Sequence, residues 1–155
     1  MKQRLDFLTT TPNVVRAMLG LHKPLSQSGL EKSLLDLVYF RVSQINGCAF
    51  CLDMHSKDLR AEGETEQRLY VLEAWRESPF YSDRERAALA WAEAVTTLGD
   101  KNVPDDVYEQ ARAQFSEAEL VNLTLAVIAI NGWNRLNIAF RTTPGTYEVG
   151  MVFAA

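Results

Sequence analysis

The sequence has few of the residues that carry nucleophilic or metal-binding chemistry. Its 155 residues include only two cysteines and two histidines. In a reducing compartment, two cysteines rarely serve as a permanent structural staple. A catalytic, redox or metal-binding role is therefore expected for this pair.

Other absences exclude whole classes of function. The net charge is -4 and no cluster of Lys and Arg could neutralise phosphates, so a nucleic-acid partner is not expected. The longest apolar run, residues 120–130, contains Asn122 and Thr124 and is too short to span a bilayer. Residues 1–7 lack the apolar run of a signal peptide. We expect a cytoplasmic protein without a membrane segment.

The chain has the length and composition of one globular domain, residues 1–155, with 47% hydrophobic and 23% charged residues. No stretch alternates apolar and polar residues with the period of a strand. Capping boxes start helices at Ser82 with Glu85 and at Ser116 with Glu119. The sequence predicts an all-α single-domain bundle, with helices near residues 11–19, 30–46, 48–63, 65–75, 82–97, 104–115 and from 116 to about 140, and a connector over 21–28.

The last predicted helix is apolar on nearly every face between Leu120 and Ile130. Such a helix lies at the centre of a domain or in a subunit interface, so we expect a homo-oligomer. Asn131 and Asn134 interrupt its apolar character, and buried amides need hydrogen-bond partners. We expect them to cap neighbouring backbone or to join subunits.

Both cysteines and one histidine stand in a single short motif, Cys48-x-x-Cys51-x-x-x-His55. On a helix, residues three and four apart are neighbours, so two thiols and an imidazole would share one face. The thiols could form a disulfide, which the spacing of a regular helix would make easy to reduce, and His55 could take a proton from Cys51. The helix start favours Cys48 as the more acidic thiol and His55 favours Cys51, so their order stays open.

Four further residues have roles that depend on packing. Asp36 lies twelve positions before Cys48 on the preceding helix, where it could pass protons or orient His55, or lie in solvent. His22 lies in the predicted connector and is expected at the surface. Phe50 and Met54 are expected to pack around the thiols and form an apolar pocket for an organic peroxide.

Residues 36–55, DLVYFRVSQINGCAFCLDMH, resemble the signature of alkylhydroperoxidase D-like proteins of the carboxymuconolactone decarboxylase-like superfamily. Residues 129–141 resemble the closing helix of many members. The resemblance implies an all-α fold assembled as trimers or hexamers, and a peroxidase or disulfide-reductase activity that needs no cofactor.

The same resemblance assigns roles to individual residues. Cys51 would attack the hydroperoxide and become a sulfenic acid, and Cys48 would resolve it to a disulfide. His55 and Asp36 would form a proton relay, and an unknown thiol or protein reductant would restore the dithiol. Two positions differ from the family's best-known pattern: Asp36 replaces a glutamate, and Phe50 replaces a histidine.

Two alternatives remain open at this stage. Cys48, Cys51 and His55, with Asp36 or His22, could hold zinc in a redox or metal sensor. The chain could also be a small-molecule enzyme of the superfamily's decarboxylase type, although that branch generally lacks the cysteine pair.

Overall fold

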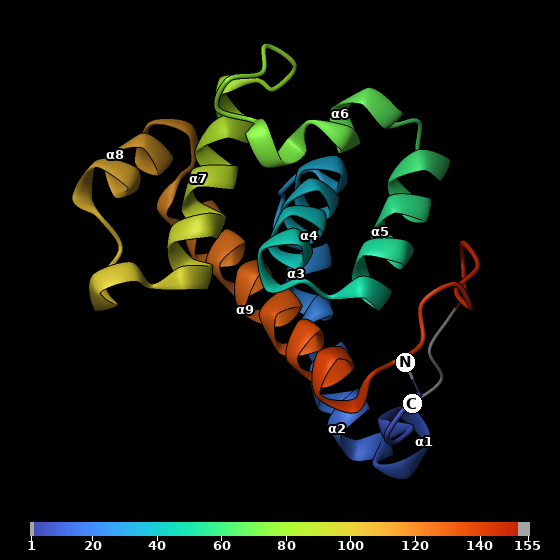
Figure 1. Cartoon of the computed structure of the whole chain (residues 1–155). Helices are drawn as coiled ribbons and strands as arrows, with labels where there is room; N and C mark the ends of the chain where they lie inside the picture. Colours follow the sequence, from blue (N-terminus) through green and yellow to red (C-terminus); the bar gives the residue numbers. More distant parts are fainter. Residues whose placement is uncertain (1, 152–155) are drawn as a thin grey trace.

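The computed structural model describes residues 2–151, and the regular elements in that range are all helical, which confirms the predicted fold class (Figure 1). The elements are α1 (Phe7–Thr10), α2 (Pro12–Gly20), α3 (His22–Ser26), α4 (Lys32–Asn46), α5 (Ala49–Ala61), α6 (Glu66–Tyr70), η1 (Leu72–Ala74), α7 (Asp83–Thr97), η2 (Gly99–Lys101), α8 (Asp105–Gln114) and α9 (Glu117–Phe140). The two η elements are short 3-10 helices.

Helix α4 lies at the centre of the bundle and packs against α5, α7 and α9 (Figure 1). Its side chains enter two apolar clusters. Leu34, Val38 and Val42 pack with residues of α7, α8 and α9, whereas Leu37 and Phe40 pack with residues of α5, α6 and the η1 region. Burial on several sides fixes the position of α4, and with it the turn that leads to the cysteines.

Helix α9 is the long apolar helix that the sequence predicts, and it begins at the expected capping box of Ser116 with Glu119. Its asparagines connect it to the end of α4. The Asn46 side-chain amide donates to the Asn131 and Asn134 oxygens at 2.9 Å each, and Asn134 Nδ2 donates to Ser43 Oγ at 3.1 Å. Within the chain, these amides bridge two helices instead of only capping neighbouring backbone.

The N-terminal part differs from the prediction. Residues 21–28 are not merely a connector, because His22–Ser26 forms α3, and α1 precedes the first predicted helix. Pro24 is compatible with α3 because proline is tolerated in the first turn of a helix, where its missing N–H has no intrahelical partner. The predicted helix over 65–75 is also shorter: α6 ends at Tyr70 and continues as the 3-10 helix η1.

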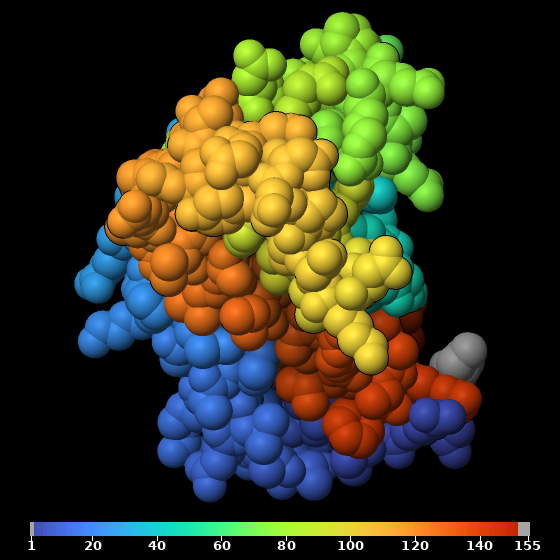
Figure 2. All heavy atoms as spheres, turned by 90° about the vertical axis from the view of Figure 1, so that its left-hand side faces the viewer, coloured from blue at the N-terminus to red at the C-terminus, as the bar shows by residue number. Residues whose placement is uncertain are grey.

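Helices α2 and α3 pack against α9, and the Arg4 backbone N–H donates to the Phe140 carbonyl at 2.9 Å. Figure 2 shows the N-terminal residues in blue at the foot of the molecule, below the yellow and orange residues of α8 and early α9. Among the described residues, no single helix has both the length and the apolarity of a membrane span. Only α8 and α9 taken together reach that length and apolarity, and the two helices are bent by 117° at the break between them.

Candidate functional site

The cysteines lie at the turn from α4 to α5 and form the predicted disulfide. Gly47 ends α4 with a φ of 67°, a conformation that glycine adopts at low cost. The sequence predicts Cys48 in the first turn of this helix. In the structure, Cys48 is instead the N-cap of α5. The two Cα atoms lie 5.3 Å apart, within the range that a disulfide spans, and Cys48 Sγ also accepts the Cys51 N–H at 3.3 Å.

A second polar side chain reaches the sulfur of Cys51 from α9. Asn137 Nδ2 lies 3.7 Å from Cys51 Sγ and also donates to the Trp133 carbonyl at 2.9 Å. Cys51 and Asn137 are both buried. An amide donor in this place stabilises negative charge on Cys51 sulfur. Asn137 was not predicted as a site residue, although the signal that marks Asn131 and Asn134, an amide in an apolar helix, marks Asn137 as well.

His55 lies on the same helix as Cys51 and is buried, with 8% of its surface exposed. Burial, together with the smaller effects of the charges on His22 and Lys32, lowers the pKa of His55 to about 4. The imidazole is therefore neutral at pH 7. Its Nε2 atom is buried and has no hydrogen-bond partner among the described residues, so this atom is available to a bound molecule.

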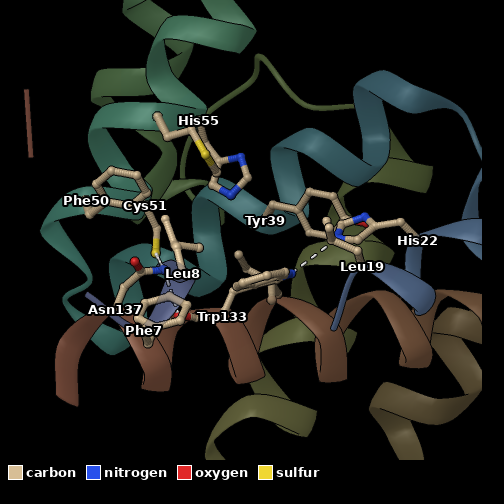
Figure 3. A pocket seen from close by; sticks show the side chains of 12 residues that line it. Phe7, Leu8, Leu19, His22, Tyr39, Phe50, Cys51, His55, Trp133 and Asn137 are labelled. Carbon is tan, nitrogen blue, oxygen red and sulfur yellow. Dashed lines mark hydrogen bonds between the residues drawn. The ribbon is translucent and has the colours of Figure 1, made fainter. Parts of the chain in front are cut away.

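Cys51 and His55 both line a cavity of about 240 Å3 (Figure 3). Its walls are mainly apolar, and its polar members include His22, Tyr39 and Asn137. The apolar members are Phe7, Leu8, Leu19, Phe50, Met54, Ile130 and Trp133. The apolar pocket expected beside the thiols is therefore present, and α1 to α3 supply part of its wall.

His22 is the site residue that the sequence analysis placed wrongly. It is half-buried in α3 and lines the cavity, so both histidines of the chain lie in its wall. Trp133 Nε1 donates to His22 Nε2 at 3.2 Å, which places the proton of the neutral ring on Nδ1. In Figure 3, His22 lies at one end of the cavity and Cys51 and Asn137 at the other.

Asp36 is not among the residues that line this cavity. Its carboxylate pairs with Lys32 at 2.6 Å, and Lys32 also bonds Glu62 at the end of α5. Burial raises the pKa of Asp36 to about 6, against the opposing effect of Lys32. Its connection to the site is through Tyr39, one turn later on α4, whose ring centroid lies 5.6 Å from that of His55. Burial and the charge of Asp36 raise the pKa of Tyr39. The role of Asp36 as a relay acid stays a prediction.

The cysteines and histidines do not form a metal-binding cluster in this structure. Within residues 2–151, no group of three or more His, Cys, Asp or Glu side chains is arranged to hold a metal ion. Both sulfurs are instead in the disulfide. No specific observation therefore favours the zinc alternative.

The all-helical bundle, with a CxxC disulfide at the start of a helix beside an apolar cavity, agrees with the alkylhydroperoxidase D-like class that residues 36–55 resemble. The chain belongs to the carboxymuconolactone decarboxylase family, whose pattern matches residues 12–94. The uncharacterized protein YdfG of Bacillus subtilis is 44% identical over 139 residues, which cover 90% of this chain and 95% of YdfG.

Solved structures agree with this membership. A protein of unknown function from Agrobacterium tumefaciens, provisionally assigned to AhpD-type antioxidant defence, is 42% identical with a TM-score of 0.89, covering 94% of this chain and all of the other. The debrominase Bmp8 has a TM-score of 0.76 at 20% identity, covering 90% of this chain and 75% of Bmp8. This more distant likeness concerns the fold alone.

Proposed function

We propose that the protein is a thiol-dependent peroxidase that reduces organic hydroperoxides through the Cys48–Cys51 pair. The observation that carries the proposal is the position of Cys51, whose sulfur borders an apolar cavity that also contains the neutral His55. Cys51 thiolate attacks one oxygen of the hydroperoxide, the O–O bond breaks, and Cys51 becomes a sulfenic acid. The alkoxide that leaves takes the proton that His55 accepted from the thiol and departs as an alcohol. Cys48 then displaces water from that sulfur, and the disulfide forms.

The surrounding residues support each step. His55 Nε2 is unpaired and neutral, so it can accept the proton of the Cys51 thiol when a bound water or a small motion connects them. Asn137 stabilises the thiolate of Cys51. The start of α5 and the Cys51 N–H stabilise the thiolate of Cys48, the resolving residue.

The cavity favours compact organic peroxides. Its volume of about 240 Å3 lies below the roughly 300–1,000 Å3 of pockets that enclose drug-sized ligands. Apolar walls stabilise a hydrocarbon group and give no compensation for the hydration that hydrogen peroxide loses. We therefore expect cumene hydroperoxide to react faster than hydrogen peroxide.

The first test is oxidation of the reduced protein by one equivalent of cumene hydroperoxide, with a free-thiol count and an intact-mass measurement. We expect two thiols to disappear and the chain to lose the mass of two hydrogen atoms, reversibly with a dithiol. Repeated turnover with excess dithiol would separate an enzyme from a sensor that is oxidised once. Thiols that remain after peroxide treatment would contradict the proposal.

We also propose that the protein is a homo-oligomer, as the resemblance implies, with α9 in the interface. Val121 and Ile128 stand two turns apart on α9 and are 69% and 54% exposed. Light scattering at micromolar concentration should give a trimer or hexamer. The variant Ile128→Glu should shift the particle toward the monomer because it places a charge in the interface. A monomeric wild type would contradict this proposal.

A further inference from the structure

The two sulfurs of the disulfide border different cavities. Cys51 lines the apolar cavity described above, whereas Cys48 lines a second, more open hollow of about 440 Å3. Phe50 and Asn137 line both and form the wall between them. A molecule in the apolar cavity therefore contacts Cys51, and a molecule in the second hollow contacts Cys48.

The second hollow, here called the Cys48 groove, is lined by residues 47–50 at the start of α5 and by 137, 138 and 141–144 after the end of α9. Arg141 contributes a cation, and within residues 2–151 no carboxylate forms an ion pair with it. Thr142 Oγ1 is buried and has no hydrogen-bond partner in the same range. The groove thus offers positive charge, supplied by Arg141.

We propose that the Cys48 groove binds the reductant, a small thiol that carries a negatively charged group, and that this thiol attacks Cys48 sulfur. The inference rests on the proposed peroxidase function and names the partner of its second half-reaction. The open groove has room for a small molecule. Cys48 itself is only 1% exposed, which favours a slender thiol over a cysteine on a folded protein surface.

The exchange balances without another reactant. The thiolate of the reductant forms a bond to Cys48 sulfur, the Cys48–Cys51 bond breaks, and its electron pair leaves on Cys51. A second thiol of the same class attacks the reductant's sulfur in the mixed disulfide and releases Cys48 as a thiolate. The reductant is oxidised to its disulfide, and the protons of its two thiols end on Cys48 and Cys51.

The surroundings of Cys51, on the side of the apolar cavity, explain why Cys51 is the leaving group. Attack from the groove expels Cys51 toward the cavity side, where the Asn137 amide lies 3.7 Å from its sulfur. A leaving thiolate that is stabilised departs faster. Attack on Cys51 would instead require the charged thiol to enter a cavity with mostly apolar walls, at the cost of its hydration.

The test measures the reductive half-reaction alone, with oxidised wild-type protein, alkylation to stop the reaction, and mass spectrometry to count reduced chains. Three monothiols of similar size are compared: 3-mercaptopropionate, 2-mercaptoethanol and cysteamine, with rates expressed per thiolate. We expect the anionic thiol to exceed the cationic one by about fivefold, the scale of one solvent-accessible charge pair. The variant Arg141→Glu should invert this order, and Arg16→Glu, the same charge change at an exposed residue of α2, should leave it unchanged.

A second variant, Thr143→Trp, fills the groove at an exposed position and should slow all three thiols, whatever their charge. Oxidation of the reduced variants by cumene hydroperoxide is measured separately. Slower reduction with normal oxidation supports the proposal. The proposal would be overturned if the three thiols reduced Arg141→Glu in the same order of rates as the wild type and also reduced Thr143→Trp as fast as the wild type. A wild type that peroxide does not oxidise would contradict the peroxidase function instead, and the reduction of its disulfide would still be measurable.

Discussion

Replacing Cys51 by serine is expected to abolish peroxide turnover while the helical fold persists. Cys51 is the sulfur that borders the apolar cavity, and a serine hydroxyl does not become the nucleophilic anion at neutral pH. We expect at least a thousandfold loss in kcat/KM for cumene hydroperoxide, measured with excess dithiol. Circular dichroism and thermal unfolding check that the variant is folded.

The matched control is Cys48→Ser, which removes the same disulfide and changes a sulfur to an oxygen three residues earlier. Serine is a favourable N-cap, so α5 should keep its start. In this variant Cys51 should still be oxidised once, to a sulfenic acid that a dimedone reagent captures, but turnover should be lost or slowed. Sulfenic acid on Cys48 in the Cys51→Ser variant, formed as fast as on Cys51 in the control, would reverse the assigned roles.

Acidification from pH 7 to pH 4 is expected to remove about 3 kcal/mol of the free energy of unfolding through His55. Burial lowers the pKa of His55 from the ordinary 6.5 to about 4. Between pH 6.5 and pH 4 the imidazole binds a proton in the unfolded chain but not in the folded chain. The contribution of neutral His55 to the free energy of unfolding is therefore present above pH 6.5 and is lost as the pH falls toward 4. Denaturant unfolding at a series of pH values measures it.

Asp36 has the opposite effect over nearly the same range. Its pKa is raised to about 6 by burial, so the folded chain takes up this proton more readily than the unfolded chain, and acidification stabilises it. The free energy of unfolding of the wild type, plotted against pH, contains the contributions of both His55 and Asp36. The difference between wild type and His55→Gln isolates the histidine, and Asp36→Asn should make the acid loss steeper than in wild type. If the free energy of unfolding changed with pH in the same way in wild type and His55→Gln, the lowered pKa of His55 would be contradicted.

The sequence was most informative about features that depend on residues near one another in the chain. The capping boxes at Ser82 and Ser116 are present, and α4 ends at Asn46, where the predicted helix over 30–46 ends. The disulfide also joins the expected pair. Turn and cap geometry is fixed within a few residues, so local chemistry suffices to predict it. The missed helices α1 and α3 are four and five residues long, and helices this short depend on packing more than on intrinsic propensity.

Sequence reasoning was enough to predict the all-α class, to find the Cys48-x-x-Cys51-x-x-x-His55 motif and to notice the resemblance to the family. Only the tertiary structure brought His22 and Asn137 to that motif, paired Asp36 with Lys32, and placed the two sulfurs beside different cavities. The reason is physical: spacing within one helix follows from its 3.6-residue turn, whereas Asn137 reaches Cys51 and His22 reaches the cavity only because α9 and α3 pack against the bundle.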